Sequence, residues 1–415
     1  MNADLISIKD EVHMELLQNL GPSLYQENLE VTNLQDQVYE VITNVLQIRD
    51  IVLSAYDRAR LVQEVVDEIL GLGPIQSLLR NDQITEIMVN RFDSIYVEQE
   101  GKIFESQLRF SNEEHLRRTI ERIVAHVGRR IDESSPLVDA RLPDGSRVNA
   151  VVPPIALDGA ILTIRKFSTE PFTIDDLIAL GTITEEAATF LRICVEAKLN
   201  VLISGGTGSG KTTTLNVLSS FIPDNERVIT VEDAAELQLA QPHVVRMESR
   251  PVNIEGKGLI TIRDLVRNSL RMRPDRIVVG EVRDGAALDM LQAMNTGHEG
   301  SLTTIHANSS KDALVRIENL VLMAGVDFPI RVIREQISEA IDIIIHQARL
   351  RDGSRRITEI SEVTGIDVDS IQLQDIFRFA SDSDEGEIGV LRRSGLPIVK
   401  RNKFAMQNVE IPKGF

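Results

Sequence analysis

The 415-residue sequence contains one cysteine, Cys194, and no tryptophan, and only 4% of its residues are aromatic. A single cysteine cannot form an intramolecular disulfide or a multi-cysteine zinc site, which fits a reducing compartment. No apolar run approaches the eighteen or so residues that a membrane-spanning helix needs, and the N-terminus is acidic where a signal peptide would be basic. These absences predict a cytoplasmic protein with no membrane span of its own.

Basic residues are also in deficit, since 45 Lys and Arg stand against 63 Asp and Glu, a net charge of −18. This balance argues against nucleic acid and against an anionic membrane surface as partners. Residues 1–55 are especially acidic, with nine acidic and two basic side chains. Their acidic face is either a solvated surface or a docking surface for a basic partner.

The strongest positive signal is the segment 201–214, VLISGGTGSGKTTT. An apolar strand-like run precedes a match to the phosphate-loop pattern G-x-x-x-x-G-K-[ST] at every position. Glycines let backbone N–H groups approach phosphate oxygens, the lysine carries charge for the β- and γ-phosphates, and the Thr212 hydroxyl can bind Mg²⁺. The sequence therefore predicts a site for ATP and Mg²⁺. The expected nucleotide-binding residues are Gly205, Gly206, Thr207, Gly208, Ser209, Gly210, Lys211, Thr212 and Thr213.

Two later segments read as buried strands that end in carboxylates. Residues 228–233 end in Glu232 and Asp233, and residues 276–281 form a Walker B segment with glycine at 280, where many NTPases carry aspartate. One carboxylate can orient or deprotonate the attacking water, while the other holds Mg²⁺ through its water shell. Glu232 and Glu281 are the candidates, and Glu281 joins Thr212 as a candidate metal residue. Each acid could instead be a strand-end cap or part of an inter-domain ion pair.

A run of small residues at 296–308 leads into a further strand with polar side chains. This design suits detection of a γ-phosphate, and His306 is the predicted sensor. His298 and His306 could each instead be a histidine satisfied within the core.

Patterns along the chain predict five parts. Helical periodicity appears around 5–16, 34–45 and 61–69. A β-rich stretch then contains one helix, for which Ser111 and Glu114 predict a capping box. After a proline-bearing hinge at 168–171, strands and helices alternate as in a parallel α/β sheet. The predicted parts are an acidic helical bundle (1–72), an α+β lobe (73–167), a linker (168–182), a P-loop ATPase domain (183–380) and a C-terminal tail of no legible role (381–415).

Residues 270–284, LRMRPDRIVVGEVRD, resemble the signature of the secretion and type IV pilus ATPase superfamily, and every fixed position matches. Residues 228–233 resemble that family's aspartate box, and residues 297–306 its histidine box. Within the superfamily the sequence looks most like the CpaF type of tight-adherence (Tad/Flp) pilus ATPase. The segments that support this finer resemblance are 135–149, 334–337 and 350–356.

The resemblance implies a RecA-like P-loop core with a PAS-like α+β N-terminal lobe. It also implies a homo-hexameric ring that hydrolyses ATP and acts on an inner-membrane platform protein of a pilus or secretion system. In such rings arginines of the N-terminal lobe close over the nucleotide, because a guanidinium fork can neutralise γ-phosphate charge. Arg141, Arg147 and Arg165 are the candidates, with simple surface pairing as the alternative.

Many type II secretion and pilus extension ATPases carry a tetracysteine zinc module and long N-terminal domains, which this chain lacks. These departures favour the tight-adherence or type IV secretion branches. Three alternatives remain: a type IV secretion-channel ATPase, a nucleic-acid translocase with a locally basic channel, and a non-hydrolysing scaffold that uses ATP to hold its ring together.

Overall fold

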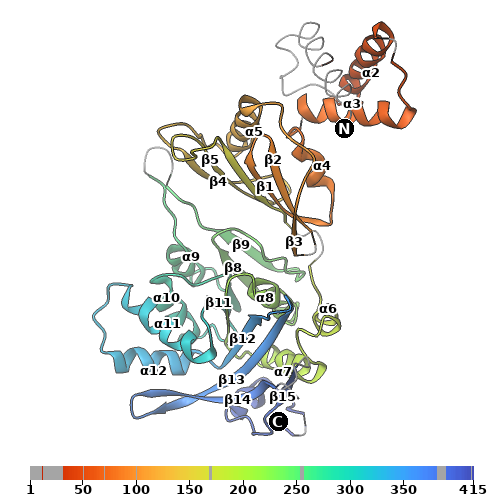
Figure 1. The fold of residues 1–415 in the computed structure, drawn as a ribbon. Helices are drawn as coiled ribbons and strands as arrows, with labels where there is room; N and C mark the ends of the chain where they lie inside the picture. The colour runs from red at the N-terminus through yellow and green to blue at the C-terminus, as the bar shows by residue number, and fades with distance from the viewer. Residues whose placement is uncertain are drawn as a thin grey trace. The chain divides into compact units, whose positions relative to one another are not determined.

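The computed structural model describes residues 12, 31–49, 51–69, 71–99, 101–167, 171–252, 257–380, 389–412 and 414–415. The chain divides into two compact units, residues 1–168 and 169–415 (Figure 1). The expected helix around 5–16 lies outside the described residues except for Val12, and the expected hinge lies outside them except for Pro171.

In the first unit, helices α2 (Val31–Ile48) and α3 (Ala55–Ile69) lie where the periodicity of 34–45 and 61–69 predicts them. Their apolar stripes form a separate small core, which includes Val38, Ile42 and Val65. A short helix, α4 (Ile75–Arg80), follows, and Arg80 pairs with the buried Asp67 of α3 at 2.7 Å.

The rest of the first unit is built on an antiparallel sheet with the strand order β3-β2-β1-β6-β5-β4 among the described residues. Helix α5 (Glu113–His126) buries Leu116, Ile120 and Ile123 in the core of this sheet. The predicted capping box is wrong by one residue, because Asn112 Oδ1 accepts from the His115 N–H at 2.8 Å. The strands are β1 (Ile84–Arg91), β2 (Ser94–Gln99), β3 (Lys102–Glu105), β4 (Leu137–Arg141), β5 (Arg147–Val151) and β6 (Ile161–Arg165).

The second unit is built on a larger sheet with the order β15-β14-β13-β12-β7-β11-β10-β8-β9. Strands β12, β7, β11, β10, β8 and β9 run parallel, and β13, β14 and β15 continue the sheet antiparallel. The strands are β7 (Val201–Gly205), β8 (Val228–Glu232), β9 (Val244–Glu248), β10 (Arg276–Val279), β11 (Leu302–His306), β12 (Ile343–Arg349), β13 (Arg355–Asp367), β14 (Ser370–Ala380) and β15 (Val390–Arg393).

Helices cover both faces of this parallel sheet, so its strands are apolar on both sides. Val201 and Ile203 belong to one core and Leu202 to the other, as strand alternation requires. Helices α10, α11 and α12 lie together on one face (Figure 1). The helices are α6 (Ile174–Ala179), α7 (Glu185–Glu196), α8 (Lys211–Ser219), α9 (Ile262–Ser269), α10 (Ala286–Asn295), α11 (Ser310–Leu322), α12 (Ile330–Ala340) and α13 (Arg401–Met406).

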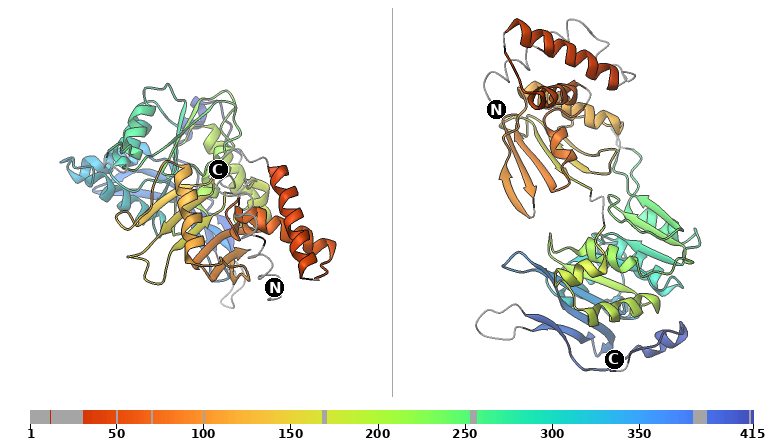
Figure 2. Two further views of the ribbon diagram at one scale, coloured as in Figure 1. Left: turned by 90° about the horizontal axis from the view of Figure 1, so that it is seen from above. Right: turned by 90° about the vertical axis from the view of Figure 1, so that its right-hand side faces the viewer.

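The described part of the C-terminal segment packs onto this unit. Strand β15 extends the sheet beside β14, and Phe404 and Phe415 are buried in the same core as Val201. Figure 2 shows the chain's C-terminus beside the blue strands of this antiparallel extension. The residues predicted as a tail of no legible role therefore contribute to the core of the second unit.

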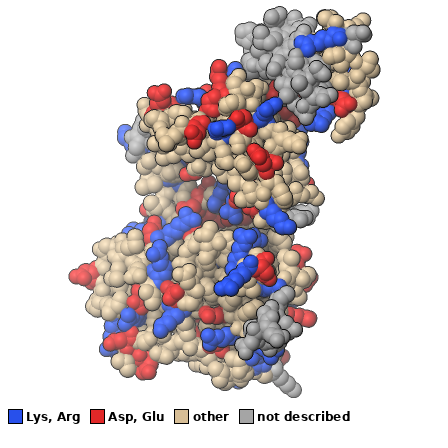
Figure 3. All heavy atoms as spheres, in the orientation of Figure 1, with Lys and Arg blue, Asp and Glu red and all other residues tan. Residues whose placement is uncertain are grey.

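Acidic and basic side chains are interspersed over the surface of the second unit in the view of Figure 3. No helix among the described residues combines the length and the apolar character needed to cross a bilayer.

Candidate functional site: the phosphate loop and its carboxylates

The phosphate loop joins the end of β7 to the start of α8. Gly208 and Gly210 have φ angles of +69° and +95°, which L side chains rarely adopt. A Cβ on Gly205 would lie 2.3 Å from the Gln347 carbonyl oxygen of β12, so the strand must carry glycine there. Nothing lies within 4 Å of the Cβ positions of Gly206 and Gly208, which leaves open space beside the loop.

Lys211 lies inside this loop. Its Nζ donates to the Gly206 carbonyl oxygen at 2.9 Å, and only 7% of the residue is exposed. Burial lowers the pKa of Lys211 from its ordinary value, while the nearby Glu281 opposes this change. The ammonium group is thus held where a phosphate oxygen could replace the Gly206 carbonyl.

The order of the sheet brings the predicted acids and the predicted sensor to the same edge. Strands β11, β10 and β8 follow β7 on one side, and all run parallel to it, so their carboxyl ends meet beside the phosphate loop. There His306 Nε2 lies 3.2 Å from Glu281 Oε1. Burial and the charge of Lys211 lower the pKa of His306, which favours its neutral form.

Arg283 connects the side chains that follow strands β8 and β10, a role that the sequence analysis does not predict. Its Nη2 donates to Glu281 Oε2 at 2.7 Å, and its Nη1 lies 3.6 Å from Asp233 Oδ2. Asp233, Arg283, Glu281 and His306 therefore form one continuous chain of polar contacts, in which the first three side chains are charged. The fixed arginine of the R-D pair at 283–284 was the sequence signal that could have indicated this residue.

Glu232 is the more buried of the two candidate acids, with 2% exposure. Its Oε1 accepts from the backbone N–H groups of Glu236 and Leu237, at 2.8 and 3.0 Å, whereas Oε2 is buried without a hydrogen-bond partner. Burial raises the pKa of this carboxyl. An oriented carboxylate with one unsatisfied oxygen is well suited to accept a proton from a water molecule.

The glycine of the Walker B segment has a steric cause. A Cβ on Gly280 would lie 3.0 Å from Glu232 Cγ, closer than about nine in ten real Cβ contacts. The space that an aspartate would occupy in other NTPases therefore lies against the Glu232 side chain. The sequence shows the departure at 280, but its reason depends on a residue 48 positions earlier.

The three candidate arginines are neighbours in the sheet of the first unit. Arg141 of β4 lies directly opposite Arg147 of β5, which lies directly opposite Arg165 of β6. Arg165 in turn lies opposite Glu86, with Nε 3.6 Å from Glu86 Oε1. These three residues (the arginine row: Arg141, Arg147 and Arg165) therefore lie side by side on the sheet, and their contact with the nucleotide stays a prediction.

Thr212 and Thr213 lie half-buried in the first turn of α8. His298 lies in the turn before β11, and none of its described interactions is with Glu232 or Glu281. Within the described ranges, no group of three or more His, Cys, Asp or Glu residues could hold a metal by itself. Mg²⁺ usually takes one or two protein groups together with water and substrate phosphates, so Thr212 and Glu281 stay predicted metal residues.

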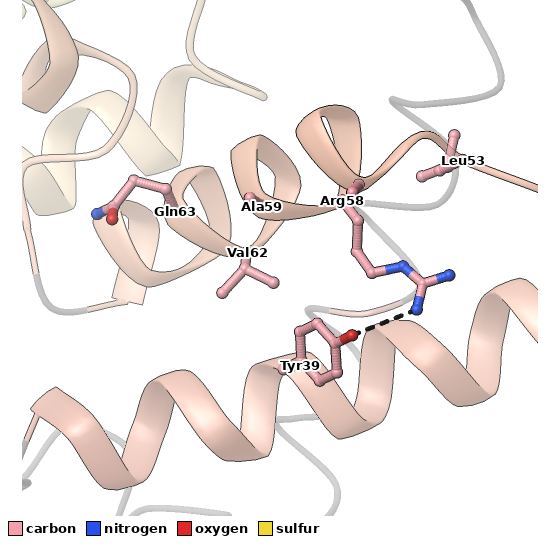
Figure 4. Close-up of a pocket in the computed structure, with 7 residues that line it drawn as sticks. Tyr39, Leu53, Arg58, Ala59, Val62 and Gln63 are labelled. Carbon is pink, nitrogen blue, oxygen red and sulfur yellow. Dashed lines mark hydrogen bonds between the residues drawn. The ribbon is translucent and has the colours of Figure 1, made fainter.

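A separate pocket of about 530 Å³ lies on the helices of the first unit (Figure 4). Arg58 Nη1 donates to Tyr39 Oη across it at 3.5 Å. The pocket shares no residue with the phosphate loop or its carboxylates, and its lining residues are Tyr39, Leu53, Ala55, Arg58, Ala59, Val62 and Gln63.

Comparison with known proteins agrees with this site. Residues 68–377 match the family of type II/IV secretion system proteins. The chain is 36% identical over 257 residues to the conjugal transfer protein TrbB of Rhizobium radiobacter, which covers 61% of this chain and 75% of TrbB. It is 33% identical over 332 residues to the type IV secretion system protein VirB11 of Bartonella henselae, which covers 70% of this chain and 91% of VirB11.

Among solved structures, the ATPase DotB of Legionella pneumophila aligns with a TM-score of 0.50 at 23% identity, over 69% of this chain and 79% of DotB. This likeness supports the RecA-like fold. The family match includes the phosphate loop, both candidate acids and His306. The chain therefore belongs to the type II/IV secretion system protein family, and it is an ATPase of the secretion type.

Proposed function

We propose that this protein is a hexameric, Mg²⁺-dependent motor that acts from the cytoplasm on an inner-membrane platform protein to assemble a tight-adherence pilus. The observation that carries the catalytic part is the buried, unsatisfied Oε2 of Glu232 at the sheet edge that also carries Glu281, His306 and the phosphate loop. The CpaF-like segments 135–149, 334–337 and 350–356 support the pilus as the load.

The residues divide the chemistry between them. Lys211 exchanges its bond to Gly206 for the β- and γ-phosphates, and the loop N–H groups hold the same oxygens. Glu232 orients and deprotonates the attacking water through its free oxygen. Mg²⁺, held by Thr212 and through water by Glu281, would neutralise charge on the β- and γ-phosphates.

His306 then reports on the γ-phosphate through Glu281. In the described structure the Glu281 carboxylate is held by both His306 and Arg283. A γ-phosphate beside Lys211 competes with Glu281 for the Arg283 guanidinium and the His306 N–H, so its arrival and loss would rearrange these contacts. In the ring, the arginine row would supply further positive charge to the nucleotide.

The test is phosphate release by the purified protein with Mg-ATP, alongside Lys211→Ala and Glu281→Gln, with assembly followed by light scattering. We expect a hexamer that hydrolyses ATP, a Lys211 variant that loses binding and turnover, and a Glu281 variant that binds ATP without hydrolysing it. Lys311→Ala, an exposed change on α11, is the matched control and should keep wild-type turnover. A wild type that binds ATP and assembles but releases no phosphate, even with membranes, would support the scaffold alternative instead.

The names of the relatives favour a second load, a type IV secretion channel. Deleting the gene in the cell that carries it distinguishes a pilus from a secretion channel as the system on which the ATPase acts. Loss of surface pili with unchanged DNA transfer would support the pilus. Loss of DNA or effector transfer with intact pili would move the assignment to a secretion channel.

A further inference from the structure

The turn between β12 and β13 is rich in arginine, and the proposed chemistry gives its side chains no role. Arg349 and Arg355 are exposed and lie directly opposite each other across the two strands. The turn itself is well fixed, because Asp352 Oδ1 accepts from both the N–H and the hydroxyl of Ser354, at 2.8 and 2.7 Å. Two arginines placed opposite each other on a fixed turn concentrate positive charge there, which suits a ligand that a guanidinium can bind.

Arg355 contacts the phosphate loop. Its Nε donates to the Gly208 carbonyl oxygen at 3.1 Å, and its Cδ lies 3.3 Å from the Cβ position of Gly210. Gln347 of β12 closes the same corner, because its Oε1 accepts from the Thr214 hydroxyl of α8 at 2.6 Å. The Arg355 guanidinium therefore contacts the loop at Gly208, while Gln347 and Thr214 connect β12 to α8 beside it.

The order of the sheet indicates which end of a nucleotide would face Arg355. The groups that act on the γ-phosphate, Glu281 and His306 among them, end the strands on the β11 side of β7. Strands β12 and β13 lie on the other side of β7. A triphosphate bound with its γ-phosphate toward Glu281 therefore extends its nucleoside toward the β12–β13 turn.

We propose that Arg355 is a nucleotide-positioning residue that binds the nucleoside of ATP, with its planar guanidinium stacked on the base. This inference rests on the proposed hydrolysis at the phosphate loop. A guanidinium can stack on the aromatic ring of a base, as an aromatic side chain would. Only 4% of the residues in this chain are aromatic, so an arginine can take that place.

The neighbouring residues keep the strand in place. Arg356 Nη1 donates to the Leu180 carbonyl oxygen at 3.1 Å, and the Ile357 N–H donates to the Thr182 carbonyl oxygen at 2.9 Å. A Cβ on Gly181 would lie 1.9 Å from the same Arg356 nitrogen, so the backbone there passes unusually close to the arginine. Residues 180–182, which follow α6, thus fix the strand that presents Arg355.

The test compares binding of ADP with binding of inorganic tripolyphosphate, which has no nucleoside, by titration calorimetry. We expect Arg355→Ala to weaken ADP binding at least about tenfold and to change tripolyphosphate binding less than about twofold. Arg355→Lys keeps the positive charge but loses the planar guanidinium, so it should weaken ADP binding to an intermediate extent. Arg351→Ala, in the same turn and with no contact to the loop among the described interactions, is the control and should bind both ligands normally.

Equal weakening of both ligands would overturn the inference and assign Arg355 to bracing of the loop. Unchanged ADP binding in both Arg355 variants would also overturn it. If Arg355→Ala does not fold, Arg355→Lys decides by the same comparison. A wild-type protein that binds ADP but releases no phosphate would contradict the proposed hydrolysis alone, since this measurement needs no turnover.

Discussion

The glycine at residue 280 leaves room for the side chain of Glu232, the proposed general base. Because a Cβ at 280 would already approach Glu232 Cγ to 3.0 Å, a larger side chain must displace the glutamate. We expect Gly280→Asp to lower the rate of phosphate release at least about a hundredfold, since it adds both bulk and a like charge beside a general base. Gly280→Ala adds only the Cβ and should lose less than about tenfold. Equal rates for wild type and Gly280→Asp would show that the position of Glu232 does not matter.

Burial of Glu232 also sets an expectation for the pH dependence of turnover. A general base works deprotonated, and burial raises the pKa of this carboxyl above the ordinary value of 4.5. The kcat should therefore fall as the pH is lowered through a midpoint above 4.5, earlier than for a solvent-exposed glutamate. Glu232→Gln should lower kcat about 10²–10⁴-fold and remove this acid limb. A Glu232→Gln variant that is slow but keeps the limb would assign the limb to another group.

At the scale of elements, a buried ion-pair network connects the C-terminal segment to the start of β7, the strand that leads into the phosphate loop. Asp342 is fully buried and pairs with Lys400 at 2.7 Å and with Lys403 at 2.8 Å. The same carboxylate accepts from the Asn200 N–H at 2.8 Å, immediately before β7. One buried charge therefore joins β12, β7 and the segment that contains α13.

Removing that charge should destabilise the second unit. Asp342→Asn keeps the shape but leaves two lysines without their counter-ion, and loss of one partner of a buried ion pair typically costs about 3–5 kcal/mol. We expect a clear drop in the urea midpoint of unfolding for this variant. Asp224→Asn, an exposed change in the turn before β8, is the control and should leave the midpoint unchanged. A normal midpoint for Asp342→Asn would mean that the C-terminal segment contributes little to stability.

Local patterns predicted much of this architecture, because the phosphate loop, the acidic strand ends and the helical stripes are each contained in a few consecutive residues. The rest depends on pairs far apart in the chain. Asp342 meets Lys400, Gly208 meets Arg355 and Gly280 meets Glu232 only once the strand order is set. A single sequence gives no strand order, so these contacts could not be predicted from it. The N-cap of α5 was predicted one residue too early, because Ser111 and Asn112 are both residue types that favour the N-cap position.

At the scale of the whole molecule, the arginine row is proposed to act on a nucleotide. Its three arginines occupy directly opposed positions on neighbouring strands, and Arg165 also lies opposite Glu86. In a ring built from identical head-to-tail contacts, each nucleotide site lies near a neighbouring subunit. Arginines that act across such a contact would make hydrolysis depend on assembly.

Mixed rings can test this arrangement. The double variant Arg141→Ala/Arg147→Ala keeps its own phosphate loop and Glu232, and we expect it to bind ATP without hydrolysing it. The variant Glu232→Gln is also inactive but keeps the arginine row. The two variants are mixed in equal amounts and assembled at random. If the arginines act on a neighbour's nucleotide, about a quarter of the subunit contacts then place an intact arginine row beside an intact Glu232. Phosphate release should then recover to roughly a quarter of the wild-type rate, measured after co-assembly and compared with unmixed samples. Mixed rings that stay inactive would show that the row acts within its own chain or not at all.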